Sequence, residues 1–213
     1  MSLAGALWRD NAELAATALA HPFVRGLADG TLPAGVFAGY LAQDAFFLDS
    51  FARAYALALA HSPDRAGLHA FADLLAGVRE ELRLHASYAR RWDIDLDRVE
   101  PLPATSAYTD FLLATAALGD VGQTCAAMTP CMRLYAYLGQ SLAGSQPSDR
   151  YHDWIATYAD PGFEQLAARL EGLLDTYGSP GPRTATAYRR AMRLEVAFFD
   201  AAYPDADAPH GPR

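Results

Sequence analysis

The sequence predicts an all-α fold, and three observations lead to this class. Long segments carry apolar residues every three or four positions, which is the spacing of a core-facing helix. Short stretches rich in proline and glycine separate these segments, and no alternating run bounded by hairpin signals is present. The composition, with 52% hydrophobic and 20% charged residues among 213, is that of a globular protein with a substantial core. We therefore expect helices over nearly the whole chain.

Eight helices are expected in chain order. Their predicted bounds are Leu3–Ala20, Ala34–His61, Pro63–Trp92, Ser106–Leu118, Val121–Ala143, Asp149–Tyr158, Phe163–Tyr177 and Thr184–Ala202. Ser62-Pro63 has the form of an N-cap followed by a proline in the first turn, whereas Asp160-Pro-Gly162 and Ser179-Pro-Gly-Pro182 are breaks between helices. No break resembles a flexible linker, so one domain is expected over residues 1–203. Residues 204–213 are small, polar and proline-containing, and we expect a disordered tail there.

Charge and cysteine content argue against several functional classes. The chain has 17 basic and 25 acidic residues, a formal charge of −8, and no Lys/Arg stripe, so nucleic-acid binding is not expected. Cys125 and Cys131 are the only cysteines, which suggests neither a disulfide framework nor a zinc cluster and favours a reducing compartment. Neither a leader-like N-terminus nor an uninterrupted apolar run of about 18 residues is present. We expect a soluble, cytoplasmic protein without a membrane partner.

The segment from Met128 to Tyr135 is the most informative part of the chain. One helical face carries Ala127, Met128, Cys131, Leu134, Tyr135 and Leu138. Cys131 is therefore expected to point into the core. Pro130 either bends the helix or places Cys131 in a first turn, and either arrangement favours a thiolate. A buried free cysteine is most often simply a small apolar side chain, so this segment alone leaves both interpretations open.

Two carboxylates interrupt other apolar helical faces, where a charge is costly. The faces read Phe37, Tyr40, Leu41, Asp44, Phe47, Leu48, Phe51, Tyr55 and, separately, Tyr188, Ala191, Met192, Glu195, Phe198, Phe199. Asp44 and Glu195 could each pair with an arginine or tyrosine, but with a thiol they also form an acid–base set, because desolvation raises carboxyl pKa values. Glu81 and His85, one turn apart, are interpreted as a local ion pair or helix-packing hydrogen bond.

Several motifs in order carry a resemblance that is nearly full length. They are His21-Pro-Phe23, Asp29–Pro33, Tyr40–Asp44, Glu80–His85, Tyr108, Thr129–Tyr135, Tyr151–Tyr158 and Glu195. In these motifs the chain resembles the TenA family, the thiaminase II and aminopyrimidine aminohydrolase enzymes of thiamin salvage. The stretches 43–44, 108–115, 127–136 and 192–195 are especially similar to the TenA domain of plant thiamin-salvage proteins.

The resemblance implies a heme-oxygenase-like helical bundle, usually a homotetramer, with neither metal nor organic cofactor. It implies that Cys131 is the nucleophile that adds to a pyrimidine ring, and that Glu195 is the acid/base partner of a ring nitrogen. Asp44 is expected to hold the 4-amino group of the ring. The implied reaction converts 4-amino-5-aminomethyl-2-methylpyrimidine, and thiamin as a further substrate, to 4-amino-5-hydroxymethyl-2-methylpyrimidine.

Five further residues are implied to bind this substrate. Tyr135 and Tyr158 are expected to hydrogen-bond near the thiol and the leaving group, while Tyr108 and Phe198 form aromatic walls. Many bacterial relatives carry a tyrosine at the position of Phe47, whereas the plant-like relatives share the phenylalanine. The missing hydroxyl is expected to shift the substrate preference toward smaller pyrimidines.

Two other functions stay open at this level. The same pocket would suit a pyrimidine-binding or regulatory protein without catalysis, although binding alone does not need a nucleophile. The same bundle also hosts heme and dimetal oxidases. Glu81 and His85, however, are spaced i,i+4 rather than as the paired Glu-x-x-His motifs of di-iron bundles, which argues against a metal centre.

Overall fold

A computed structural model describes residues 2–92, 94–145 and 149–203. In this part of the chain all regular elements are helical, which confirms the predicted all-α class. The α-helices are α1 (Leu3–Asp10), α2 (Ala12–Ala20), α3 (Pro22–Asp29), α4 (Ala34–Ala60), α5 (Arg65–Trp92), α6 (Pro103–Leu118), α7 (Val121–Leu142), α8 (Asp149–Ala159), α9 (Pro161–Tyr177) and α10 (Pro182–Ala202), with a 3₁₀ turn at Leu96–Arg98. The tail expected at 204–213 lies outside the described residues.

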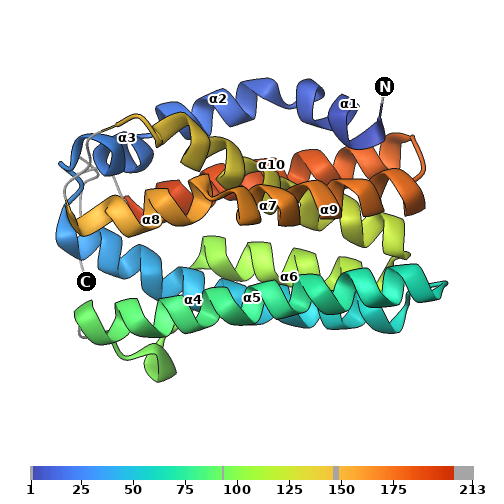
Figure 1. The fold of residues 1–213 in the computed structure, drawn as a ribbon, viewed down its shortest axis with the longest axis horizontal. Helices are drawn as coiled ribbons and strands as arrows, with labels where there is room; N and C mark the ends of the chain where they lie inside the picture. Colours follow the sequence, from blue (N-terminus) through green and yellow to red (C-terminus); the bar gives the residue numbers. More distant parts are fainter. Residues whose placement is uncertain (1, 93, 146–148, 204–213) are drawn as a thin grey trace.

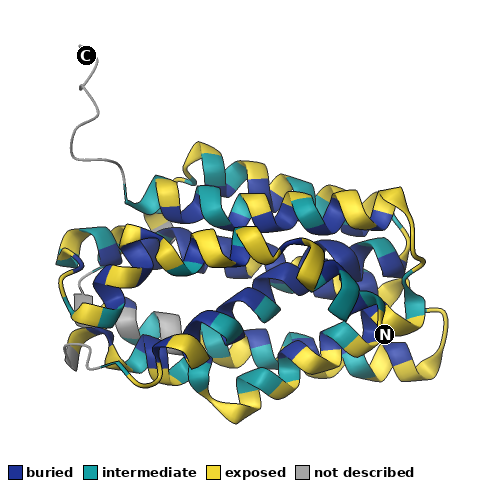
Figure 2. Cartoon of the chain, turned by 90° about the horizontal axis from the view of Figure 1, so that it is seen from above, coloured by how far each residue is buried: buried dark blue, intermediate teal, exposed yellow. Residues whose placement is uncertain are grey.

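The helices form layers around α7. Figure 1 shows α4, α5 and α6 along one side of the bundle, α7 to α10 in the middle, and α1 to α3 across the other side. Nearly every position of α7 is buried, because α8, α9 and α10 pack on it and α4 and α6 approach it from the opposite side. Figure 2 shows that buried residues gather where helices face one another. A helix apolar on all sides is expected at such a centre.

The prediction of one helix over Leu3–Ala20 is wrong, because the chain breaks at Asn11. The Asn11 side chain donates to the Leu7 carbonyl at 2.8 Å, and its backbone leaves helical geometry at φ −119°. Asparagine favours such local bonds over the helical ladder. The short helix α3 was not expected either; His21 caps it by accepting from the Phe23 amide at 3.1 Å, and proline follows in the first turn.

The predicted cap at Ser62-Pro63 is also wrong, because α5 begins at Arg65. Asp64 takes the capping role, since its carboxylate accepts from the Gly67 amide at 2.8 Å. Ser62 instead donates to the Ala58 carbonyl at the end of α4.

The predicted breaks at Asp160 and Ser179 are confirmed, with small shifts in the helix starts. Asp160 caps α9 by accepting from the Gly162 amide at 2.7 Å. Pro161, Pro182 and Pro103 therefore occupy the first turns of α9, α10 and α6, two to three residues before the predicted starts.

A glycine and an arginine fix α8 and α9 against α7. A Cβ on Gly139 would lie 2.3 Å from the Tyr158 carbonyl carbon, so only glycine permits this approach. Arg133 of α7 donates to Glu164 at 2.8–2.9 Å and to Glu171 at 2.6–2.9 Å, both on α9. These contacts position Tyr158 and the first turn of α9 beside the middle of α7.

Candidate active site

A small closed cavity lies beside the middle of α7. Its volume is about 10 Å³, room for about one water molecule. The lining residues come from α4, α5, α7, α8 and α9 and are Asp44, Phe47, Leu48, Phe51, Glu81, Cys131, Met132, Tyr135, Tyr158 and Phe163. Five of the residues predicted from the sequence, Asp44, Phe47, Cys131, Tyr135 and Tyr158, therefore meet at one place.

Cys131 lies in the interior of α7, after Pro130, and not in a first turn. Proline in a helix leaves the carbonyl one turn earlier without its usual partner. Burial raises the pKa of the Cys131 thiol well above its ordinary value, and the nearby carboxyl groups of Glu195, Glu81 and Asp44 add to the effect. Burial therefore opposes the thiolate that a bend or a helix start at Pro130 would favour, and it favours the protonated thiol.

Glu195 of α10 lies behind the cavity wall and is 2% exposed. Its carboxyl group accepts a hydrogen bond from the Tyr108 hydroxyl at 2.6 Å and is hydrogen-bonded to the Cys131 thiol. Burial, with a smaller contribution from the charge of Asp44, raises the pKa of Glu195 to about 8, although the two hydrogen bonds oppose the rise. At neutral pH the carboxyl group is therefore mostly protonated.

Hydroxyl groups surround the remaining side of the cavity. The Tyr135 and Tyr40 hydroxyls are 3.0 Å apart, and the Trp154 indole donates to Tyr40 at 3.3 Å. Burial raises the pKa of Tyr135 and of Tyr158 well above the ordinary value, so both remain neutral donors. Asp44, 4% exposed, is the carboxylate of α4 in this wall.

Glu81 is a member of the lining that the sequence interpretation missed. The Tyr158 hydroxyl donates to its carboxylate at 2.7 Å, so Glu81 bonds across the cavity wall to α8. The sequence did carry a signal of its burial, because Glu81 interrupts an apolar helical face as Asp44 does. It was assigned to a local pair with His85, whose side chain lies outside the described residues.

Tyr108 and Phe198 do not line the cavity but form a second row of rings behind it. The Phe47 ring lies 4.8 Å from the Tyr108 ring and 6.0 Å from the Phe198 ring, measured between centroids. In this closed arrangement the Phe47 ring therefore lies between the cavity and these two rings, so a ligand in the cavity would contact Phe47 first.

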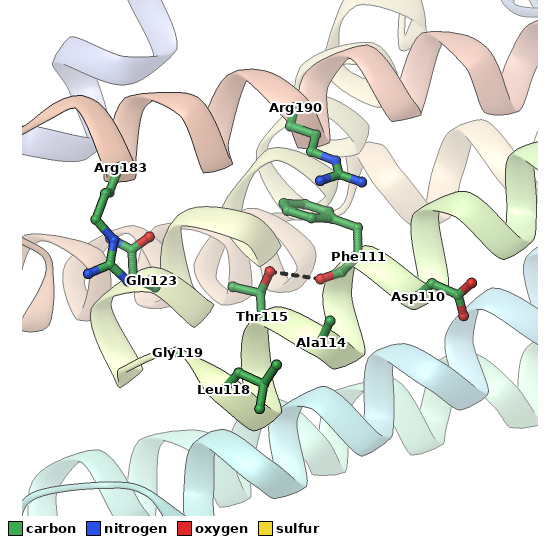
Figure 3. Close-up of a pocket in the computed structure, with 9 residues that line it drawn as sticks. All are labelled: Asp110, Phe111, Ala114, Thr115, Leu118, Gly119, Gln123, Arg183 and Arg190. Atoms are coloured by element: carbon green, nitrogen blue, oxygen red, sulfur yellow. Dashed lines mark hydrogen bonds between the residues drawn. The ribbon is translucent and has the colours of Figure 1, made fainter.

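A larger groove of about 490 Å³ lies elsewhere, between α6, the start of α7 and α10. Figure 3 shows its side chains, with the Arg190 guanidinium 4.6 Å from the Phe111 ring centroid and the Thr115 hydroxyl donating to the Phe111 carbonyl at 2.7 Å. None of the predicted site residues lines this groove. The predicted site residues therefore lie in or behind the wall of the closed cavity and not at this groove.

The described residues form neither a metal-binding cluster nor a helix able to cross a membrane. No group of three or more His, Cys, Asp or Glu residues there is arranged to hold a metal ion. Among the same residues, no helix combines the length and apolar character needed to cross a membrane.

The layered bundle with its enclosed site is of the heme-oxygenase-like class, as predicted. A Shewanella denitrificans domain described as having a heme oxygenase-like fold superimposes with a TM-score of 0.64 at 17% identity, covering 93% of this chain and 91% of that one. The chain belongs to the TENA/THI-4/PQQC family, whose sequence model matches residues 8–205.

Similar proteins agree with the predicted resemblance. The aminopyrimidine aminohydrolase of Halalkalibacterium halodurans is 32% identical, over 95% of this chain and 96% of that protein. The mitochondrial bifunctional TH2 protein of Arabidopsis thaliana is 35% identical over 94% of this chain, which spans 37% of the plant protein. A Silicibacter protein described as a TenA family transcription regulator superimposes with a TM-score of 0.88 at 31% identity, covering 94% of this chain and 96% of that one.

Proposed function

We propose that this protein is an aminopyrimidine aminohydrolase of thiamin salvage. It converts 4-amino-5-aminomethyl-2-methylpyrimidine to 4-amino-5-hydroxymethyl-2-methylpyrimidine, and acts on thiamin as a further substrate. The relative from Halalkalibacterium halodurans carries the corresponding name and aligns over nearly the full length of both chains. The observation that carries the proposal is the buried hydrogen bond between the Cys131 thiol and the Glu195 carboxyl group.

This pair supplies a nucleophile and an acid without burying a net charge. Glu195 is protonated at neutral pH and donates to a ring nitrogen, which makes the aminopyrimidine electrophilic. The carboxylate that remains is hydrogen-bonded to Cys131 and accepts the thiol proton as sulfur adds to the ring carbon. The high pKa of the resting thiol is thus compatible with catalysis, because the proton leaves only as the C–S bond forms.

The subsequent steps regenerate both groups. Addition of sulfur breaks the aromaticity of the ring, and its electrons expel the 5-substituent as the C–N bond at the methylene breaks. Water adds to the exposed methylene carbon and loses a proton. Glu195 then returns a proton to Cys131 as the C–S bond breaks and the ring nitrogen is deprotonated. Ammonia leaves from the aminomethyl substrate, and the thiazole leaves from thiamin.

The other lining residues orient the ring. Asp44 accepts a hydrogen bond from the 4-amino group, because a buried carboxylate suits an N–H donor of a neutral ring. Tyr135 and Tyr158 donate near the sulfur and the leaving group, and Glu81 holds Tyr158 in place. Phe47 packs on one face of the heterocycle, with Tyr108 and Phe198 supporting it from behind. Lacking a hydroxyl at Phe47, the site favours the smaller aminomethyl substrate over thiamin.

We further propose that residues 1–203 act as one domain in a cytoplasmic homotetramer without a cofactor. A binding or regulatory role is the second candidate function, since the Silicibacter relative is described as a transcription regulator. That role requires no thiol beside a protonated carboxyl group.

Mass-spectrometric product analysis of the purified protein separates these functions. The protein is incubated with the aminomethyl pyrimidine and, separately, with thiamin. Hydroxymethylpyrimidine from the amine, formed faster than from thiamin, is the expected result. Tight binding of the pyrimidine without either product would contradict the hydrolase and support the regulatory role.

A further inference from the structure

A second cavity lies directly outside the closed one. Its volume is about 470 Å³, and it is lined by Gly77, Glu80, Glu81, Ala156, Thr157, Asp160, Phe163 and Leu166. Glu81 and Phe163 line both cavities, so their side chains form the partition between them. The outer cavity and the cavity at the Cys131 thiol therefore adjoin at this partition.

The partition must move for a ligand to reach the thiol. The inner cavity has room for about one water molecule, which is far less than a substituted pyrimidine ring needs. The outer cavity, by contrast, is in the size range of small-molecule sites. In a joined cavity, the ring of a bound pyrimidine would lie at the thiol and its 5-substituent would lie in the outer part.

Phe163 is the movable part of this partition. Its half-buried ring packs edge-on against Tyr158 with centroids 4.9 Å apart. The backbone around it is held: Asp160 caps the helix, and Glu164 is bonded to Arg133 at 2.8–2.9 Å and to Gln140 at 2.7 Å. A rotation of the Phe163 side chain would therefore open the partition without a shift of α9.

Glu81 is the fixed part of the partition. Its carboxylate accepts from Tyr158, whose backbone is packed against Gly139. Opening by movement of Glu81 would break that hydrogen bond, whereas opening by Phe163 costs only an apolar ring contact.

The outer cavity is acidic. Glu80, Glu81 and Asp160 contribute carboxylates, and no basic side chain is among its lining residues. Arg83 pairs with Glu80 at the exposed rim. A concave site lined by one sign of charge concentrates ligands of the opposite sign. The aminomethyl group of the proposed substrate is an ammonium at neutral pH, and the thiazolium of thiamin is also a cation.

We infer that the outer cavity is the substrate entrance and the subsite for a cationic 5-substituent, with Phe163 as its gate. The identity of the substrate in this inference rests on the proposed function. The gate and the charge selection do not, because they concern access to Cys131 by any small molecule.

Labelling of Cys131 by methanethiosulfonates tests the entrance without turnover. The folded protein is treated with the neutral methyl reagent and with the trimethylammonium-ethyl reagent, and the Cys131 peptide is quantified by mass spectrometry. Phe163→Ala should raise both labelling rates about tenfold, with Phe163→Leu intermediate. Phe111→Ala removes an equally half-buried ring from the α6 groove and should leave both rates unchanged.

The charge of the entrance is tested in the same assay. The ratio of cationic to neutral labelling, normalised to a small free thiol, should exceed one in the wild type. It should fall by about tenfold, the low end of electrostatic focusing, in Glu80→Gln/Asp160→Asn. Asparagine at position 160 keeps the helix cap. High salt should lower the wild-type ratio in the same direction.

Two results would overturn the inference. Equal labelling of wild type and both folded Phe163 variants would remove the gate, and an unchanged ratio in the double variant would remove the charge selection. If the wild type forms no product, but the Phe163→Ala variant is labelled faster than the wild type, the entrance stands. That pair of results would contradict the proposed function instead.

Discussion

The thiol of Cys131 on α7 is hydrogen-bonded to the carboxyl group of Glu195 on α10. Both groups are buried, and burial raises both pKa values, to about 8 for Glu195. Two neutral acids in contact form a pair through which protons can pass to and from a substrate.

Replacement of Glu195 by glutamine should lower kcat by about 10²- to 10⁴-fold, because the amide cannot protonate a ring nitrogen. Affinity for hydroxymethylpyrimidine should change little, since the shape and the acceptor for Tyr108 are kept. Steady-state kinetics and isothermal titration measure the two quantities. A kcat within about threefold of the wild type would remove the acid role.

Activity should fall as the pH rises through about 8, because Glu195 then loses the proton that it donates. The hydrogen bond from Tyr108 lowers the pKa of Glu195, so Tyr108→Phe should raise that pKa. The falling limb of the pH profile should move to higher pH in this variant. A limb that stays in place or moves to lower pH would contradict the assigned hydrogen bond.

The raised pKa of Glu195 should also make the free energy of unfolding depend on pH. Between its ordinary value of 4.5 and about 8, the folded state binds the Glu195 proton more tightly than the unfolded state does. The stabilisation is therefore complete below pH 4.5 and is lost as the pH rises to about 8. The glutamine of Glu195→Gln does not titrate, so the variant does not lose this stabilisation. The free energy of unfolding of the variant minus that of the wild type should therefore increase from pH 4.5 to about 8, by on the order of 4 kcal/mol at most. Denaturant unfolding at several pH values measures the difference, and a difference independent of pH would contradict the shift.

Gly139→Ala should destabilise the fold and displace Tyr158. The added methyl would lie 2.3 Å from the Tyr158 carbonyl carbon, so backbone must move, at a cost of about 1–3 kcal/mol. Gly172→Ala is the control, because nothing lies within 4 Å of its added methyl and alanine favours a helix by about 1 kcal/mol. Thermal unfolding should therefore move in opposite directions for the two variants. Equal shifts would show that α7 and α8 are not in the described contact.

The apolar helical faces predicted that Asp44 and Cys131 are buried, and the resemblance to the TenA family placed both at one substrate. Glu81 carries the same signal but was assigned to a neighbour on its own helix, and only the tertiary structure reveals the Tyr158 hydroxyl of α8 as its partner. The sequence left the pKa of Cys131 undetermined. Proline placement is local, whereas the desolvation that sets the pKa comes from helices distant in sequence.

Phe163 shows a different limit. Its position near the start of α9 follows from the Asp160-Pro cap, which the sequence predicted to within two residues. That its ring separates two cavities depends on the angle at which α9 meets α5 and α8, which no helical periodicity encodes. Helical periodicity also failed to reveal the break at Asn11, because the apolar pattern continues across it.

Covalent catalysis by Cys131 is tested by two cysteine variants, of which Cys125→Ser is the control. Cys125 lies on the same helix and is also buried, with a pKa raised to about 12, but it does not line the cavity. Turnover of the aminomethyl pyrimidine is measured in Cys131→Ser and Cys125→Ser, with ligand affinity determined for both. Cys131→Ser should lose turnover by at least about 10³-fold while it still binds the pyrimidine, whereas Cys125→Ser should turn over normally. Near-normal turnover in Cys131→Ser would contradict covalent catalysis by this thiol.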